Sequence, residues 1–215
     1  MKQILFNTEM VQGIMAGTKT VTRRLIRPQP PKDAQLSMGA NMDVCHAFDG
    51  ALDHRPNDRR VYMAPYKPGD ILYVRETWAK CQNAESYVYK ADFNGYAAEV
   101  FYPSIKWHPS IHMPKEAARI FLRVTDVRVE RLKDIDGEGA EAEGVIEINN
   151  PLIREDKATY DAYARRLFAI TWENTVEKDK QGLYGWNANP WVWVIEFERI
   201  GRINPILGER AGTAR

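Results

Sequence analysis

The sequence contains little cysteine, and its two cysteines lie far apart. Cys45 and Cys81 are the only cysteines among 215 residues, and they form no C-x-x-C pair. This excludes a disulfide-rich scaffold and argues against a zinc site built on cysteine, although a single disulfide stays open. The low cysteine content favours a reducing compartment, so we expect a cytoplasmic protein.

The chain also lacks a charge imbalance and a long hydrophobic run. It has 30 Lys and Arg against 29 Asp and Glu, for a net charge of +1. No global field therefore draws it to nucleic acid or membrane, and any nucleic-acid site must be a local patch. The opening residues MKQILFNTEM hold no signal peptide, and no segment is apolar enough to span a bilayer, so we expect no membrane partner.

Local patterns predict both strands and helices. A strand at 4–6 precedes a short helix that is capped by Asn7 or Thr8 and ends at Gly17. Further strands are predicted at 71–78, 86–92, 120–129 and 191–200, with helices before Gly144 and at 158–172. In contrast, residues 27–68 show no sustained period and are predicted to be an insertion or an ordered loop. Together these elements predict a β-rich α+β domain.

The strand predicted at 120–129 contains a change of phase. Ile120, Leu122 and Val124 alternate on one face, whereas Val127 and Val129 carry the apolar positions after them. Such a slip predicts a β-bulge near Thr125 and Asp126, because one extra residue restores the buried face. Bends of this kind occur in strands that wrap small barrels.

The stretch GTKTVTRRLIRPQP, residues 17–30, gathers polar groups that can do chemistry. Thr22 is a weak nucleophile that needs a base, and Lys19 is a base only if its pKa falls from about 10.4. Burial or the neighbouring Arg23 and Arg24 would lower that pKa. From the spacing alone, the favoured interpretation is an exposed strand.

Several blocks of the sequence resemble ASCH domains of the PUA-like superfamily. ILFNTEMVQGIMAGTKTVTRRLI contains the family pattern Gly-x-Lys-x-x-Thr-x-Arg, as Gly17, Lys19, Thr22 and Arg24. KPGDILYVRETWA, RIFLRVTDVRVERLKDIDGEGAEAEGV and NPWVWVIEFERI are similar to the later family blocks and come in the family's order. The set is most similar to ASCH proteins encoded by phages and prophages.

The resemblance implies a PUA-like β-pseudo-barrel with flanking helices and a cleft beside the first helix and strand. Small family members are amidohydrolases that deacylate N4-acetylcytidine with a lysine, a threonine and a glutamate. Carried over, these roles fall on Lys19 as the base and Thr22 as the nucleophile, and Glu143 would orient the site or carry the proton to the leaving amine. Glu141 and Glu138 are alternatives to Glu143, and Arg24 would steady the site or bind an anion.

The chain is about twice as long as those small enzymes. We expect one domain at 1–202 with large loop insertions at about 28–66, 79–115 and 146–190, followed by a tail at 203–215. The insertions would either form a lid or fill the cleft.

Other residues were considered for binding. The basic residues Lys19, Arg23, Arg24, Arg27, Lys32, Arg55, Arg59 and Arg60 form either a phosphate-binding face or a solvated surface. Tyr184 and Trp186, in the loop-like GLYGWNANPW, suit a cleft rim. Arg75 and Glu76 are expected to face each other's neighbours across the sheet. A structural ion pair is the favoured interpretation, and exposure to the cleft is the alternative. His108 and His112 lie four residues apart but between prolines, so no metal site and no cofactor are predicted.

Two functions from different classes follow. The first is an amidohydrolase acting on N4-acylated cytidine or a related modified nucleoside. The second is a non-catalytic module that binds RNA or a nucleotide, and RNA cleavage is a weaker third hypothesis. The first requires Lys19, Thr22 and Glu143 to converge in an open pocket. The second requires a basic and aromatic groove.

Overall fold

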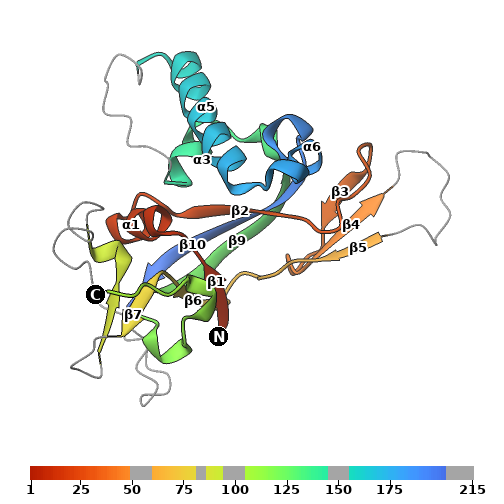
Figure 1. Ribbon diagram of the computed structural model, residues 1–215. Helices are drawn as coiled ribbons and strands as arrows, with labels where there is room; N and C mark the ends of the chain where they lie inside the picture. Colours follow the sequence, from red (N-terminus) through yellow and green to blue (C-terminus); the bar gives the residue numbers. More distant parts are fainter. Residues whose placement is uncertain (49–59, 81–85, 94–104, 145–154, 202–215) are drawn as a thin grey trace, which may run out of the picture.

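A mixed five-stranded sheet forms the centre of the molecule. The structure is a computed structural model, and it describes residues 1–48, 60–80, 86–93, 105–144 and 155–201. The strand order is β1 (Lys2–Leu5), β6 (Ile71–Arg75), β9 (Phe121–Arg131), β10 (Trp191–Ile200) and β2 (Val21–Leu25). β1 and β6 are parallel, and the other neighbours are antiparallel (Figure 1). Among the described strands β1 and β2 remain edges, so the fold is α+β with an open sheet.

The first helix begins and ends where the sequence predicts. In α1 (Thr8–Ala16) the Asn7 side chain accepts a hydrogen bond from the backbone of Met10 at 2.8 Å, which decides between the two predicted caps. Gly17 follows with a φ of 81°, a left-handed conformation that suits glycine at a helix end. The chain can therefore turn directly from α1 towards β2.

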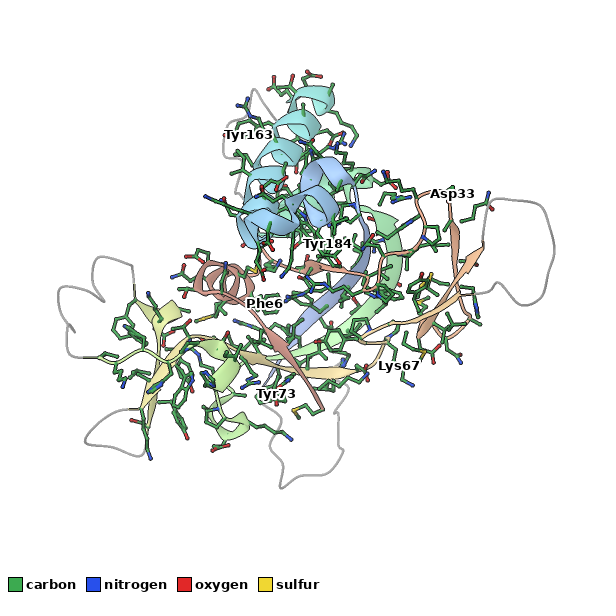
Figure 2. All side chains as sticks on the ribbon, turned by 45° about the vertical axis from the view of Figure 1, so that its right-hand side comes forward. Phe6, Asp33, Lys67, Tyr73, Tyr163 and Tyr184 are labelled. Carbon is green, nitrogen blue, oxygen red and sulfur yellow. The ribbon has the colours of Figure 1, made fainter. Side chains whose placement is uncertain are left out.

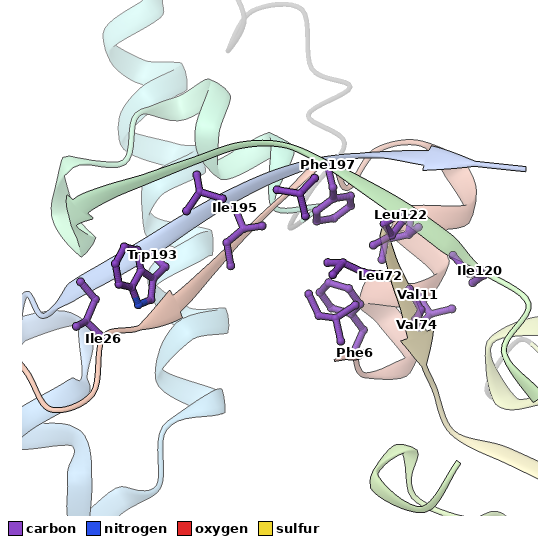
Figure 3. Close-up of a cluster of buried hydrophobic side chains, with 14 of the residues drawn as sticks. Phe6, Val11, Ile26, Leu72, Val74, Ile120, Leu122, Trp193, Ile195 and Phe197 are labelled. Atoms are coloured by element: carbon purple, nitrogen blue, oxygen red, sulfur yellow. The ribbon is translucent and has the colours of Figure 1, made fainter. Parts of the chain in front are cut away.

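Both faces of β10 are buried. Trp193, Ile195 and Phe197 point into one core cluster together with Phe6 from the turn before α1, as Figure 3 shows. Val192 and Val194 point into a second cluster beneath the helices. Strand alternation explains the division, since successive side chains lie on opposite faces.

The predicted bulge in β9 is confirmed. Glu196 pairs with Asp126 and Phe197 pairs with Val124, so Thr125 has no partner across the strands. The extra residue lets Val124 and Val127, which are three residues apart, both lie in the first core cluster.

Three helices cover the second face of the sheet. These are α3 (Gly137–Ala142), α5 (Lys157–Thr175) and α6 (Gln181–Tyr184), which lie on the same side of β2 and β10 in Figure 1. The helix predicted at 158–172 is thus confirmed, and it buries Tyr160, Ala164, Phe168 and Trp172 at helical spacing. No helix in the described ranges is long and apolar enough to cross a membrane.

The prediction that residues 27–68 are irregular is wrong for the described part. β3 (Gln35–Met38), β4 (Val44–Phe48) and β5 (Arg60–Met63) form a separate antiparallel sheet at the right of Figure 1. Each strand has only four or five residues, which is too short for a hydrophobic period to be recognised. Cys45, which is a free thiol, and Tyr62 anchor this sheet in the first core cluster.

The single strand predicted at 71–78 is interrupted. β6 ends at Arg75, and β7 (Trp78–Lys80) pairs instead with β8 (Tyr87–Tyr89), because Glu76 turns inwards between them. The remaining elements are the short 3-10 helices η1 (Lys90–Asp92), η2 (Ser110–His112), η3 (Lys115–Ala117), η4 (Leu132–Asp134), η5 (Lys178–Lys180) and η6 (Trp186–Ala188). Cys81 and the predicted tail at 203–215 lie outside the described residues.

Candidate functional site

Lys19, which precedes β2, and Glu143, which follows α3, form a buried ion pair. The Lys19 Nζ donates to Glu143 Oε2 at 2.7 Å, to the Glu143 backbone oxygen at 2.8 Å and to the Val21 backbone oxygen at 2.8 Å. The two side chains are 0% and 5% exposed. An ammonium group has three protons, so every donor of Lys19 is satisfied.

Glycine allows the two segments to approach this closely. Lys19 and Glu143 form an isolated antiparallel bridge, and Gly144 follows with a φ of 77°. A Cβ atom at Gly144 would lie 2.9 Å from the Lys19 Cβ, and one at Gly13 would lie 3.2 Å from it. The glycine that follows Glu143 therefore has a steric role beside Lys19.

Arg23 continues the charge network across the helix-covered face of the sheet. Its Nη1 lies 3.4 Å from Glu143 Oε1, and its Nη2 lies 3.2 Å from Glu130 Oε2. Its guanidinium carbon lies 5.9 Å from the ring centre of Phe168, and its Nε is buried with no partner among the described residues. Burial lowers the pKa of Lys19, and the charge of Glu143 opposes that effect.

Thr22 lies on the opposite face of β2 from Arg23. It pairs with Ile195, whose side chain is in the first core cluster, and strand alternation places Arg24 on the same face. Thr22 is 3% exposed, and its hydroxyl makes no hydrogen bond within the described part of the chain. The three predicted catalytic residues are therefore only partly brought together: Lys19 and Glu143 pair, and Thr22 is not bonded to either.

Arg24 is held between the first core cluster and solvent. Its Nη2 donates to the Leu5 backbone oxygen at 2.7 Å, and its guanidinium carbon lies 5.2 Å from the ring centre of Phe6. Burial lowers the pKa of this guanidinium. Within the described residues Arg24 forms no salt bridge with a carboxylate.

A cavity of about 360 Å³ lies beside β2. It is lined by Arg23, Arg24, Leu25, Arg27, Trp172, Thr175, Val176, Glu177, Lys180 and Tyr184. Three lining residues on the helix-covered side, Arg23, Arg27 and Lys180, are cationic and one, Glu177, is a carboxylate. Arg24 also borders the cavity, but its guanidinium lies on the other face of β2. Lys19, Thr22 and Glu143 do not line it.

Aromatic rings contribute to the same cavity. The guanidinium carbon of Arg27 lies 5.0 Å from the ring centre of Tyr184, and Figure 2 shows Tyr184 where α6 approaches the sheet. The Trp172 side chain is largely buried, and its indole nitrogen donates a hydrogen bond to the Tyr184 backbone oxygen at 2.8 Å. This bond fixes the position of Tyr184 against α5.

The other residues predicted for binding lie away from the cavity. Glu76 is 1% exposed, and each of its oxygens accepts from Arg119 at 2.9 Å. Burial raises the pKa of Glu76, and Arg119 opposes this. Arg75 donates instead to Gln3 Oε1 at 2.8 Å and to the backbone of Ile111. Glu76 is thus in a structural ion pair with Arg119, whereas Arg75 forms no ion pair among the described residues.

Trp186 and the histidines likewise have structural contacts. The Trp186 ring packs on Phe168 with centroids 6.1 Å apart, and its backbone N–H donates to Glu173. His108 stacks on Trp78 with centroids 5.0 Å apart. No group of three potential metal ligands exists among the described residues.

Some residues of the site could not be predicted from the sequence. Lys180, Trp172 and Glu130 belong to elements whose place beside β2 depends on tertiary packing. The predicted basic face is present in part, since Arg23, Arg24 and Arg27 line the cavity. Lys32 does not line it. Of the other members of that face, Arg55 and Arg59 lie outside the described residues, as does the Arg60 side chain.

The chain was compared with known proteins in three ways. Protein-family models, curated proteins and solved structures gave no match.

Proposed function

We propose that this chain is a PUA-like domain of the ASCH type that binds a nucleotide or RNA without catalysis, in the cavity beside β2. One observation carries the proposal: Arg23, Arg27 and Lys180, together with the ring of Tyr184, line a cavity that contains one carboxylate. Lysine and arginine neutralise phosphates, and aromatic or guanidinium planes stack on bases.

The family assignment rests on how the resembling blocks assemble. The block at 4–26 supplies β1, α1 and β2, and the block at 119–145 supplies β9 and α3. Lys19 from the first block contacts Glu143 from the second, 124 residues away. Gly17 and Gly144 have the positive φ angles that favour glycine. The contact between Lys19 and Glu143 supports an ASCH-type arrangement, because it joins residues of two resembling blocks.

The binding hypothesis is tested with a labelled short single-stranded RNA and fluorescence anisotropy. Arg27→Ala is the informative variant, because Arg27 is exposed and lines the cavity, so its loss does not unfold the protein. We expect about tenfold weaker binding from the loss of one charge-assisted contact. Affinity should also fall as salt rises, with a shallower slope for the variant.

Arg166→Ala is the matched control. Arg166 is an exposed arginine on α5 that does not line the cavity, so RNA affinity should stay at the wild-type value. Equal weakening in both variants would mean that only net charge matters. That result, or no RNA binding by the folded wild type, refutes the proposed site.

A second candidate is the amidohydrolase, and one observation favours it. The lysine and glutamate to which the resemblance assigns catalysis are in contact at 2.7 Å, and burial lowers the pKa of that lysine, as a general base requires. Against it, the Lys19 ammonium already has three acceptors, and neither Lys19 nor Thr22 lines the cavity. The closed geometry makes binding the better supported function.

Hydrolysis of N4-acetylcytidine by purified protein tests this second candidate. Turnover that is lost in both Lys19→Ala and Thr22→Ala would establish it. Because Lys19→Ala also removes a buried ion pair, each variant must first give the wild-type circular dichroism spectrum. No turnover by folded wild-type protein removes this substrate and leaves the binding function in place.

A further inference from the structure

We infer that Glu130 and Glu143 restrain anion binding in the cavity beside β2, because they hold the guanidinium group of Arg23. Arg23 is then a reserve ligand, which an anion gains only in competition with the two carboxylates. The inference rests on the proposed function and concerns the regulation of the same cavity.

The two ion pairs of Arg23 are long. Its Nη1 lies 3.4 Å from Glu143 Oε1, and its Nη2 lies 3.2 Å from Glu130 Oε2. Hydrogen bonds between a charged N–H group and a carboxylate are normally about 2.7–2.9 Å long. The Nε of Arg23 is buried and has no partner among the described residues. The guanidinium group is therefore enclosed, but its bonds to the two carboxylates are weak.

Each of the two carboxylates has a closer cation than Arg23. Glu143 Oε2 accepts from Lys19 Nζ at 2.7 Å, and Glu130 Oε1 accepts from Arg128 Nε at 2.6 Å. A buried carboxylate is costly mainly when it loses its last partner. If Arg23 turned to an anion, both carboxylates would keep a cation, so the exchange would leave neither of them unpaired.

The cavity presents its cations to an anion unequally. Arg27 is exposed and forms no ion pair within the described part of the chain, whereas Lys180 pairs with Glu177. The Arg23 side chain also lines the cavity but is only 2% exposed. An anion therefore meets Arg27 first, and it obtains the second guanidinium only by replacing a carboxylate of Arg23.

The informative variant is Glu130→Gln, which removes a charge from a residue that does not line the cavity. Glutamine keeps the length of the side chain and an oxygen acceptor, and the Glu130 side chain is 23% exposed, so we expect the variant to fold. With one competitor neutralised, the affinity for a labelled short single-stranded RNA should rise at least about fivefold, the lower end of typical coupling between linked sites. Fluorescence anisotropy at one fixed salt concentration measures this change.

Glu196→Gln is the matched control. Glu196 also accepts a hydrogen bond from Arg128, but it makes no contact with Arg23 among the described residues. It changes the net charge by the same amount, and RNA affinity should stay near the wild-type value.

Arg23→Met tests whether the restraint acts through Arg23. In a protein that carries Arg23→Met, adding Glu130→Gln should leave RNA affinity unchanged, because the two residues then no longer interact. Each variant must first give the wild-type circular dichroism spectrum.

The possible failures are distinguishable. If RNA binds and Arg27→Ala weakens it, but Glu130→Gln matches the wild type, the restraint is wrong and the proposed function stands. An equal gain in Glu130→Gln and Glu196→Gln would show an effect of net charge, and a gain that persists without Arg23 would show another route. Either result overturns the inference. If the folded wild type binds no RNA, the proposed function fails and the inference fails with it.

Discussion

The buried pair of Lys19 and Glu143 makes a stability prediction that does not depend on any ligand. Lys19→Met keeps most of the apolar stem but removes the charge. Glu143 then keeps only Arg23 at 3.4 Å, and the carbonyls of Val21 and Glu143 lose their donor. Breaking a buried pair by removing one partner costs about 3–5 kcal/mol, because the remaining charge is uncompensated. For a chain of this size that corresponds to a melting temperature lower by roughly 6–20 °C.

The assay is urea unfolding followed by tryptophan fluorescence, since the chain has six tryptophans. Glu143→Gln and the double variant with Lys19→Met complete a double-mutant cycle. We expect a coupling of about 1–3 kcal/mol, so the double variant should be more stable than the sum of the single losses implies.

The matched control is the exposed pair of Lys2 and Asp70. Their side chains are 48% and 18% exposed and their charged atoms lie 2.8 Å apart, similar to the buried pair in distance but not in burial. Lys2→Met should cost about 0–1 kcal/mol. If Lys19→Met costs no more than this control, or if the cycle shows no coupling, the reasoning from burial is refuted.

Three further predictions concern local features. Burial places the pKa of Lys19 in the folded protein below its ordinary 10.5. Between these two pKa values the unfolded state binds more protons, so the free energy of unfolding of the wild type, relative to Lys19→Met, should rise with pH. A fall in this difference, measured by urea unfolding at several pH values, contradicts the prediction. Gly144→Ala should destabilise more than Gly17→Ala in the same assay, because both have positive φ but only Gly144 approaches Lys19; equal losses contradict the contact. Asn7→Ala should cost about 1 kcal/mol by loss of the helix cap, and Thr8→Ala much less, as measured by thermal unfolding.

Local rules predicted the central elements well. The cap at Asn7, the glycine end of α1 and the bulge at Thr125 all depend on a few neighbouring residues, and the structure has each of them. The strand predicted at 191–200 is also present, as β10. The tertiary structure then determined that both faces are buried, because helices cover the side of Val192 and Val194.

The sequence was less informative where structure depends on distant partners. β3, β4 and β5 are each too short to show a period, and they form a sheet only by pairing with one another. Glu76 was predicted to form a structural ion pair, but the sequence did not reveal its partner, Arg119, which comes from the segment before β9. Spacing along the chain does not reveal such partners, because they depend on how the strands pack.

The candidate site combines a predictable and an unpredictable part. The contact between Lys19 and Glu143 was implied by a family resemblance, and its residues lie in resembling blocks. The cavity instead takes residues from β2 and the segment just after it, and its Lys180, Glu177 and Tyr184 from the predicted insertion at 146–190. That insertion, which the resemblance does not cover, supplies six of the ten lining residues.

This difference between the Lys19–Glu143 pair and the cavity decides which function the family resemblance can suggest for the chain. The activity that the resemblance implies belongs to Lys19 and Glu143, whose side chains are enclosed and whose polar atoms already have partners. Among the described residues, Arg23 is the one that both contacts Glu143 and lines the cavity. An anion bound in the cavity would compete with Glu143 for that guanidinium. Any effect of such an anion on the Lys19–Glu143 pair would therefore pass through Arg23, whereas the choice of anion would depend on the inserted helices.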